Sequence, residues 1–265
     1  MQKDKHPIRE YWDGVAREFE CRPFHLDPFL GKLKRDAYLG LVQRWAPRHA
    51  SGTVLKTDLF EECFGPDALV PGLAEHAEFV VGFDVSPKMA RLAEAKFGNH
   101  NRFIAADVRR LPFASDYFDL IVSPSTLDHF EDPRDLGISL QELARILKPN
   151  GRLIVSLDNR QNIFDPLLRL ISRFGWIPFY LGRSYTAAEL RQELETVGFK
   201  VHEATAILHN PRLVAVASIG LARKLGWKPL QRFVQRSLEA SQCLEQTRLR
   251  YYTGSFVAAL AVKRT

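Results

Sequence analysis

The sequence has few cysteines and no long hydrophobic run. Its longest apolar run, from Leu213 to Ala222, has ten residues, whereas a membrane-spanning helix needs about 20. The first residues of the chain also lack the apolar core of a signal peptide. The cysteines, Cys21, Cys63 and Cys243, are odd in number and lie far apart, so neither a disulfide framework nor a zinc site is indicated. We therefore expect no metal site and a reducing, cytoplasmic location.

Negative charge is missing from one stretch of the chain. The 265 residues include 37 Lys and Arg and 31 Asp and Glu, which gives a formal charge of +6. The segment from Ala204 to Leu238 has no acidic residue and six basic ones, so the rest of the chain is neutral. A nucleic-acid groove needs many distributed phosphate contacts, and this distribution therefore argues against a nucleic-acid partner. The basic segment indicates a local anionic contact or a solvated face.

Short β-branched runs alternate with helical stretches in the middle of the chain, which is typical of a parallel sheet with crossover helices. Helix starts are predicted by Ser86-Pro87, by Asp132-Pro133 and by the capping-box pattern from Thr186 to Glu189. The strand candidates are Thr53–Thr57, Phe79–Phe83, Arg102–Ala105, Phe118–Ser123 and Arg152–Leu157, with two more at Lys200–Ala204 and Ser255–Val262.

Three segments do not fit this alternation. Residues 1–50 predict an amino-terminal helical cap, and residues 51–265 an α/β domain with insertions at 160–184 and 211–250. The first insertion is unusually apolar. Together with aromatic residues of the cap such as Trp12, it either closes a hydrophobic chamber for an apolar acceptor or forms the core of an extended cap.

The second insertion contains a basic amphipathic helix. A helix of this kind either lies on an anionic membrane surface, here through residues 211–238, or packs its apolar stripe on its own domain and leaves its charges in water. The stripe consists of Leu225, Leu230, Phe233, Val234 and Leu238.

Acidic residues follow two neighbouring strand candidates. In an open parallel sheet, ligands bind outside the carboxyl ends of the strands. Asp84 ends the second strand candidate, where a carboxylate can accept both hydroxyls of a ribose. Asp107 follows the third, where it can accept an adenine amino group while Val108 contacts the ring. The alternative is that both acids only cap the turns after their strands.

The order of these motifs resembles a known superfamily. The segments GFDVSPKMARLAEAK, AADVRRLPFASDYFDLIVSPSTLDHFEDP and LQELARILKPNGRLIVSLDN are together similar to class I S-adenosylmethionine-dependent methyltransferases of the small-molecule type. The resemblance implies a Rossmann-like α/β fold, with a seven-stranded, mostly parallel sheet, an antiparallel last strand and helices on both faces. It also implies S-adenosylmethionine as cofactor, with Asp84 and Val85 at its ribose, Asp107 and Val108 at its adenine, and Ser123 near its methionine part.

The first strand of the predicted sheet departs from this resemblance. Such enzymes usually carry an acid and a glycine-rich turn there, which lets the backbone approach the cofactor. This chain has Lys56 where the acid is expected and no glycine before Gly65. Asp58, Glu61 or the neighbouring Glu62 is then the candidate for the negative group that faces the cofactor's cationic part. The alternative is that the loop has lost its cofactor contacts.

The loop after the fourth strand candidate is the natural place for a general base. His129 is the candidate, because its unperturbed pKa is near 6.5, and Asp128 either orients it or acts itself. The alternative is that both residues only pack against the cofactor loop. The loop lacks the Asn-Pro-Pro-Tyr motif of nucleic-acid amino-methylating enzymes, and the chain lacks the Gly-x-Gly-x-x-Gly motif of nicotinamide and flavin enzymes.

These observations predict methyl transfer from S-adenosylmethionine to a small, apolar acceptor. The main alternative is a binding protein that keeps the sheet and has lost methyl transfer. A third interpretation, a modified adenosylmethionine whose extra carboxylate meets Lys56, depends on that one lysine.

Overall fold

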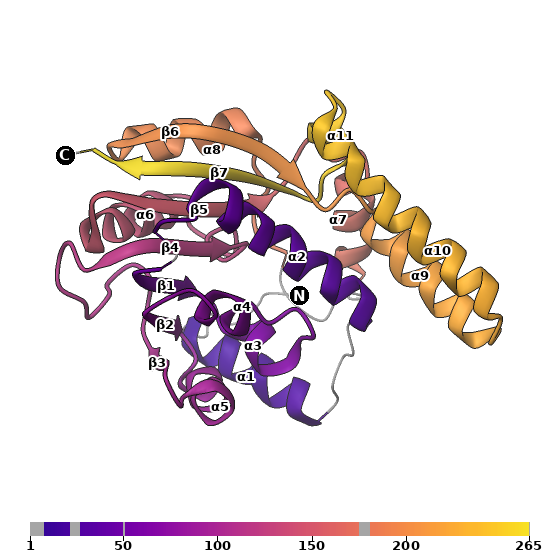
Figure 1. Cartoon of the computed structure of the whole chain (residues 1–265), viewed down its shortest axis with the longest axis horizontal. Coiled ribbons are helices and arrows are strands. Elements are labelled where there is room, and N and C mark those ends of the chain that lie inside the picture. Colours follow the sequence, from indigo (N-terminus) through magenta and orange to yellow (C-terminus); the bar gives the residue numbers. More distant parts are fainter. Residues whose placement is uncertain (1–7, 22–26, 50, 175–180, 265) are drawn as a thin grey trace.

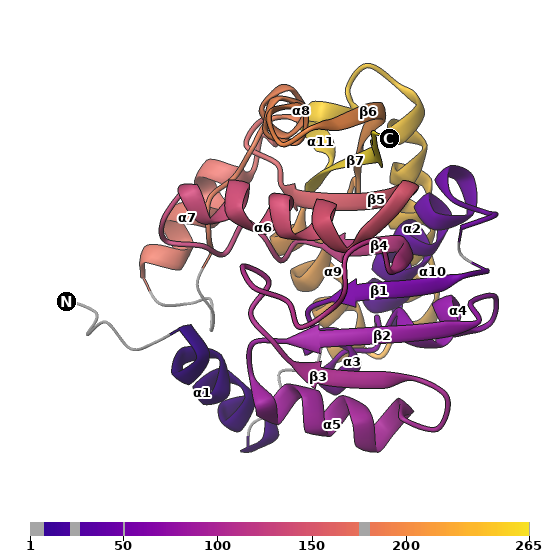
Figure 2. The same cartoon turned by 90° about the vertical axis from the view of Figure 1, so that its left-hand side faces the viewer.

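The computed structural model describes residues 8–21, 27–49, 51–174 and 181–264. Within these ranges the strands form one seven-stranded sheet in the order β3-β2-β1-β4-β5-β7-β6. Only β7 is antiparallel to its neighbours β5 and β6. Figure 1 and Figure 2 show helices on both faces of the sheet. The strands are β1 (Thr53–Thr57), β2 (Phe79–Asp84), β3 (Arg102–Ala105), β4 (Phe118–Pro124), β5 (Leu147–Asp158), β6 (Phe199–Ile207) and β7 (Phe256–Lys263).

The predicted fold class is confirmed, and each predicted strand is present within a few residues of its expected ends. The longest extension is at β5, which begins at Leu147, five residues before the expected Arg152. The helices are α1 (Ile8–Cys21), α2 (Pro28–Trp45), α3 (Phe60–Phe64), α4 (Val70–Ala74), α5 (Pro87–Phe97), α6 (Arg134–Ile146), α7 (Asp165–Arg173), α8 (Ala187–Thr196), α9 (Arg212–Lys224), α10 (Lys228–Ser241), η1 (Gln242–Gln246) and α11 (Arg250–Thr253).

Two of the three predicted helix starts have the expected cap. The Ser86 hydroxyl accepts the backbone N–H of Met89, and Thr186 and Glu189 form a reciprocal capping box. The expected cap at Asp132 is shifted, because α6 begins at Arg134 with no side-chain cap at the residue before it. The Asp132 carboxylate still accepts the backbone N–H of Arg134, so it closes a local turn instead.

The core lies on the two faces of the sheet. On one face α2, α4 and α5 pack on alternate residues of β1, β2 and β4, and on the other face α6 and α8 pack on the intervening residues. Tyr38, Leu41 and Val42 of α2 belong to the same buried cluster as Val54 of β1. The second helix of the amino-terminal segment therefore packs directly on the sheet.

Helices α9 and α10 form a hairpin between β6 and β7, which we call the basic hairpin (residues 212–241). Its inner side packs on α2 through Ala215, Ile219 and Leu238. The expectation that the whole apolar stripe packs on the domain is wrong for Leu225 and Phe233, which are 60% and 68% exposed. Among the described residues, no helix is long and apolar enough to span a bilayer.

The apolar first insertion is described only in part. It contains α7, which has no buried residue, and its residues 175–180 lie outside the described ranges. Whether it closes a hydrophobic chamber therefore stays a prediction.

Candidate functional site

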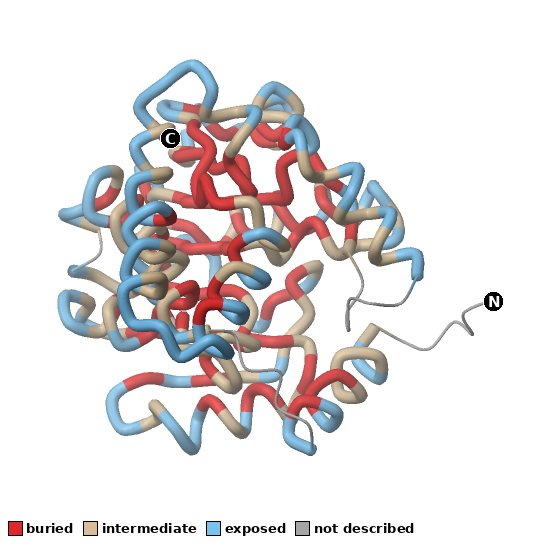
Figure 3. Tube along the Cα trace, turned by 90° about the vertical axis from the view of Figure 1, so that its right-hand side faces the viewer, coloured by how far each residue is buried: buried red, intermediate tan, exposed pale blue. Residues whose placement is uncertain are grey.

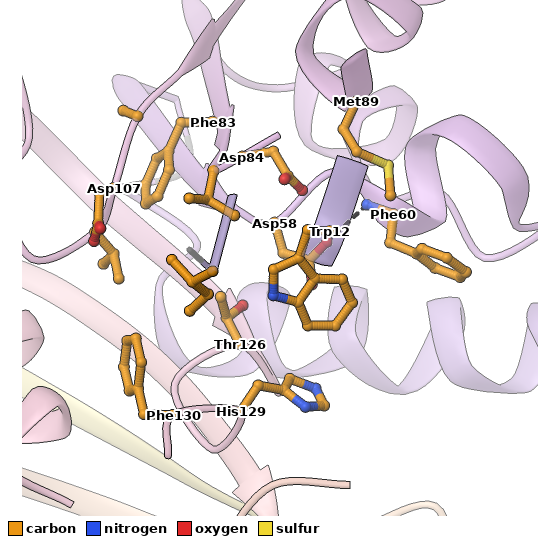
Figure 4. A pocket seen from close by; sticks show the side chains of 14 residues that line it. Trp12, Asp58, Phe60, Phe83, Asp84, Met89, Asp107, Thr126, His129 and Phe130 are labelled. Carbon is orange, nitrogen blue, oxygen red and sulfur yellow. Dashed lines mark hydrogen bonds between the residues drawn. The ribbon is translucent and has the colours of Figure 1, made fainter. Parts of the chain in front are cut away.

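A pocket opens at the carboxyl ends of β1, β2, β3 and β4, and residues of α1 also line it (Figure 4). It has a volume of about 590 Å³, its open mouth included. Parallel strands place the residues after their carboxyl ends at one edge of the sheet, which is why loops far apart in sequence meet here. The described residues that line it are Ile8, Trp12, Asp58, Phe60, Phe83, Asp84, Val85, Met89, Ala106, Asp107, Val108, Thr126, His129 and Phe130.

Asp84 is the last residue of β2 and lies at the pocket wall. One carboxylate oxygen accepts the backbone N–H of Ser86 at 2.8 Å, and the other accepts that of Leu59 at 3.0 Å. These bonds orient the carboxylate and leave each oxygen a further lone pair for a ligand hydroxyl. Burial raises the pKa of Asp84 to about 6, although both backbone bonds lower it.

Asp107 also lines the pocket, but its carboxylate is already engaged. Arg109 binds it with Nε at 3.0 Å and Nη2 at 2.6 Å, and the same guanidinium reaches Asp135 at 2.9 Å. Burial raises the pKa of Asp107, but the hydrogen bonds from Arg109 outweigh it and hold the pKa below the ordinary value. An adenine amino group would therefore share this carboxylate with Arg109. Val108 is buried and also lines the pocket, and its contact with an adenine ring stays a prediction.

Lys56 of β1 points away from the pocket into a buried ionic cluster. Its Nζ lies 2.8 Å from Glu62 and donates to the carbonyl oxygen of Asp58 at 2.6 Å. Burial lowers the pKa of Lys56, but the carboxylates of Glu62 and Glu61 raise it above the ordinary value. The ammonium thus stays charged. It fixes the loop after β1, a role that close backbone packing has in a glycine-rich turn.

Asp58 is the acid of this loop that reaches the pocket. It adopts a left-handed backbone conformation with φ of 64°, and its carboxylate accepts the backbone N–H of Phe60 at 2.7 Å. Burial and the nearby carboxylates of Glu61 and Asp84 raise the pKa of Asp58 well above the ordinary value. A half-buried acid beside other carboxylates favours a cationic ligand, because a positive charge stabilises its ionised form.

Two predicted cofactor contacts, Glu61 and Ser123, lie outside the described pocket lining. Glu61 turns toward α2, where Lys34 donates to it at 2.7 Å, and it lies 3.6 Å from Lys56. Ser123 is buried, and its hydroxyl accepts that of Thr57 at 3.0 Å. In both cases a partner inside the protein engages the polar group.

His129 lines the pocket, whereas Asp128 is buried behind it. Nε2 of His129 lies 3.9 Å from one Asp128 oxygen, beyond hydrogen-bond distance, and the imidazole meets the Trp12 ring edge to face with centroids 5.5 Å apart. The other Asp128 oxygen accepts the backbone N–H of Asp158 at 2.7 Å and the Ser125 hydroxyl at 3.0 Å. Burial raises the pKa of Asp128, although the neighbouring His129 lowers it.

Several pocket residues were not predicted as site residues. Trp12 and Ile8 come from α1, Phe60 from α3, and Thr126 and Phe130 from the loop after β4. The aromatic residues of α1 give a signal in the sequence, but no pattern says which of them turns inward. Phe60 stands in the glycine-poor loop, where the missing glycines are the only signal.

The pocket residues fit an adenosyl group carrying a cationic chain. Asp107 and Phe130 lie at one end of the pocket, and Trp12 and His129 lie at the other (Figure 4). Asp84 is a hydroxyl acceptor on the wall between them. Asp58 supplies a half-buried carboxylate, and none of the described lining residues is a lysine or arginine.

Comparison with known proteins relates part of this chain to methyltransferases. Residues 63–155 match the methyltransferase domain family. The chain is 28% identical over 158 residues to a demethylmenaquinone methyltransferase of Mycobacterium marinum, covering 58% of this chain and 61% of that protein. It is 28% identical over 109 residues to a ubiquinone/menaquinone biosynthesis C-methyltransferase of Proteus mirabilis, covering 39% of this chain and 41% of that protein.

The fold comparison extends over nearly the whole chain. The structure of an S-adenosylmethionine-dependent methyltransferase from Thermotoga maritima matches with a TM-score of 0.59 at 17% identity, covering 97% of this chain and 98% of that chain. By sequence, the chain spans 61% and 41% of the length of the two curated relatives above. Residues 63–155 thus match a methyltransferase domain, and the seven-stranded sheet has the fold of S-adenosylmethionine-dependent methyltransferases.

Proposed function

We propose that this protein transfers a methyl group from S-adenosylmethionine to a small, apolar acceptor. The observation that carries the proposal is the position of the Asp84 carboxylate, fixed by two backbone N–H groups at the end of β2, on the wall of a pocket whose other residues are mostly apolar. A carboxylate held in this way is suited to accept the hydroxyls of a ribose.

Asp84 would hold the ribose hydroxyls, with Val85 beside it. Val108 and Phe83 would contact the adenine, with Asp107 near its amino group. The Asp58 carboxylate would face the cationic chain of the cofactor, because burial makes a positive partner favourable there. When bound, this cofactor supplies an electrophilic methyl group on a sulfonium.

The protein's own task is to align an acceptor, exclude water and take up a proton where the acceptor loses one. His129 is the proposed general base, because its imidazole lines the pocket. Asp128 would position it from behind, at 3.9 Å, rather than act directly, since it is buried outside the lining. Trp12 and Phe60 would keep water from the reacting atoms.

Two observations favour an apolar acceptor. Aromatic side chains of Trp12, Phe60 and Phe130 line the pocket. The relatives from Mycobacterium marinum and Proteus mirabilis are named for menaquinone and ubiquinone synthesis. We therefore propose a quinone-like or similarly apolar ring compound as the acceptor class.

Binding of S-adenosylhomocysteine, measured by titration calorimetry, tests the cofactor site. Asp84→Asn should weaken binding about 10- to 100-fold, because it replaces charge-assisted hydrogen bonds by neutral ones. Asp119→Asn is the matched control, since Asp119 also accepts a backbone N–H, that of Thr53, but at the opposite end of β1. It should leave the affinity unchanged. No binding to the folded wild-type protein would refute the proposal.

Turnover separates methyl transfer from the second candidate, a binding protein without activity. The buried Lys56–Glu62 pair in place of a glycine-rich turn favours that alternative. If the protein is an enzyme, methyl transfer to apolar phenols or quinols should be detected by mass spectrometry. His129→Asn should then lower the rate and leave S-adenosylhomocysteine affinity intact. Binding without turnover across this panel would favour the second candidate.

A further inference from the structure

The basic hairpin projects from the body on the face of the sheet that α2 covers (Figure 1), and it lies behind the strands in Figure 2. Its inner side is fixed, because Ala215, Ile219 and Leu238 pack against Leu30 of α2. Arg223 adds an ion pair to Asp27 at 2.9 Å. The hairpin is thus a tethered arm whose outer side faces solvent.

The outer side of the arm has a regular row of positive charge. Lys228, Arg232 and Arg236 are spaced by four residues along α10, so they share one helix face, and Lys224 ends α9 just before them. These four residues have no ion-pair partner within the described part of the chain. Like charges at this spacing repel each other and destabilise a helix in water. An anionic surface would relieve that repulsion.

Large apolar side chains lie beside these charges in water. Leu221 is 57% exposed, Leu225 and Trp227 are each 60% exposed, and Phe233 is 68% exposed. Figure 3, which turns this end of the molecule toward the viewer, shows it as mostly exposed. Leu221 of α9 and Leu225, the residue that caps its carboxyl end, are four residues apart and share a face. Trp227 lies in the turn between the helices.

We propose that the end of the basic hairpin, residues 221–236, docks on an anionic lipid bilayer. Trp, Phe and Leu on one side of a helix with Lys and Arg beside them are the features of helices that lie in a membrane interface. Residues 204–238 contain no acidic side chain, so their positive charge is complementary to an anionic lipid surface. The proposal does not depend on methyl transfer.

Flotation with lipid vesicles tests the docking. Wild-type protein should float with vesicles of phosphatidylcholine that contain about 30% phosphatidylglycerol. It should bind vesicles of pure phosphatidylcholine only weakly. The variant K228Q/R232Q/R236Q should lower partitioning to the anionic vesicles about a hundredfold, since each cation contributes about fivefold. The variant L225S/W227S/F233S should lower it by about tenfold or more.

Control variants change other exposed residues of the same types elsewhere on the surface. R91Q/R134Q/K200Q removes three exposed basic residues from α5, α6 and β6, and Y117S/I138S removes two exposed apolar side chains. Both should bind vesicles as the wild-type protein does, and all variants should keep its melting temperature. Failure of the wild-type protein to float with anionic vesicles, or equal losses in the hairpin and control variants, would overturn the proposal. So would sedimentation showing that L225S/W227S/F233S converts a dimer to a monomer, because a second copy would then cover this surface.

Discussion

At the scale of single residues, burial and local partners decide what each carboxylate of the site can bind. Asp84 and Asp107 both follow strands, and both line the pocket. Within the described part of the chain, Asp84 has only backbone N–H partners, which leave it able to accept ligand hydroxyls. Asp107 is held by the Arg109 guanidinium. The two aspartates therefore differ in their capacity to bind a ligand, although the residue type is the same.

The raised pKa of Asp84 predicts a pH dependence of cofactor binding. Its pKa is about 6 because it is buried, and the ionised form is the better acceptor for ribose hydroxyls. The association constant for S-adenosylhomocysteine should therefore be constant above about pH 7 and fall below pH 6, approaching tenfold per pH unit. Titration calorimetry between pH 5 and 8 measures this.

Asp84→Asn provides the control for this pH dependence. The amide does not titrate, so its weaker binding should lose the fall below pH 6. Asp58, Glu61 and Lys56 lie near Asp84 and remain in that variant. An unchanged pH profile in Asp84→Asn would assign the titration to one of these neighbours and contradict the role given to Asp84.

At the scale of elements, the loop after β1 and helix α3 are held by charge rather than by close backbone packing. Lys56 lies between Glu62 and the carbonyl of Asp58. Glu62 in turn accepts the backbone N–H groups of Leu69 and Val70 at the start of α4. This cluster connects β1, α3 and α4, and so fixes the segment from which Asp58 and Phe60 reach the pocket.

Removing one charge of this cluster should be strongly destabilising. Lys56→Met leaves Glu62 buried without its cation and should lower the free energy of unfolding by about 3–5 kcal/mol. The double variant Lys56→Met/Glu62→Gln should recover much of this loss, because the amide oxygen can still accept from Leu69. Chemical denaturation measures both.

The surface pair Lys32–Asp36 supplies the comparison for the Lys56 variant. Both of its side chains are about half exposed, so Lys32→Met should cost less than about 1 kcal/mol. If Lys56→Met were as mild as Lys32→Met, the buried cluster would not hold the loop.

At the scale of the whole molecule, ion pairs tie the basic hairpin to the sheet. Arg212, the first residue of α9, lies 2.6 Å from Asp158 at the end of β5, and its guanidinium lies over the Phe256 ring at 4.3 Å. Asp158 donates its backbone N–H to Asp128, which stands behind His129. The start of the hairpin is thus linked to the loop that carries His129, the proposed general base.

Arg212→Leu should destabilise the protein more than the same change at Arg223. The first leaves the buried carboxylate of Asp158 without its cation near Asp128 and should cost about 2 kcal/mol or more. Arg223 is half exposed where it pairs with Asp27, so Arg223→Leu should cost about 1 kcal/mol or less. Urea denaturation of the two variants measures the loss in the free energy of unfolding. Equal losses would show that Arg212 does not fix the hairpin to the sheet.

The sequence by itself determined the sheet, the strand ends and the acids that follow them. Hydrophobic runs and turn residues are local signals, and a parallel sheet brings its carboxyl ends to one edge, so the positions of Asp84, Asp107 and His129 at the pocket follow from order alone. Only the tertiary structure decided which polar groups remain available to a ligand. Lys34 and Lys56 engage Glu61, and Thr57 engages Ser123, because packing brings together residues that no local pattern pairs. Tertiary packing also decided the exposure of Leu225 and Phe233. Helix α2 covers only the inner side of the hairpin, and these two side chains stay exposed.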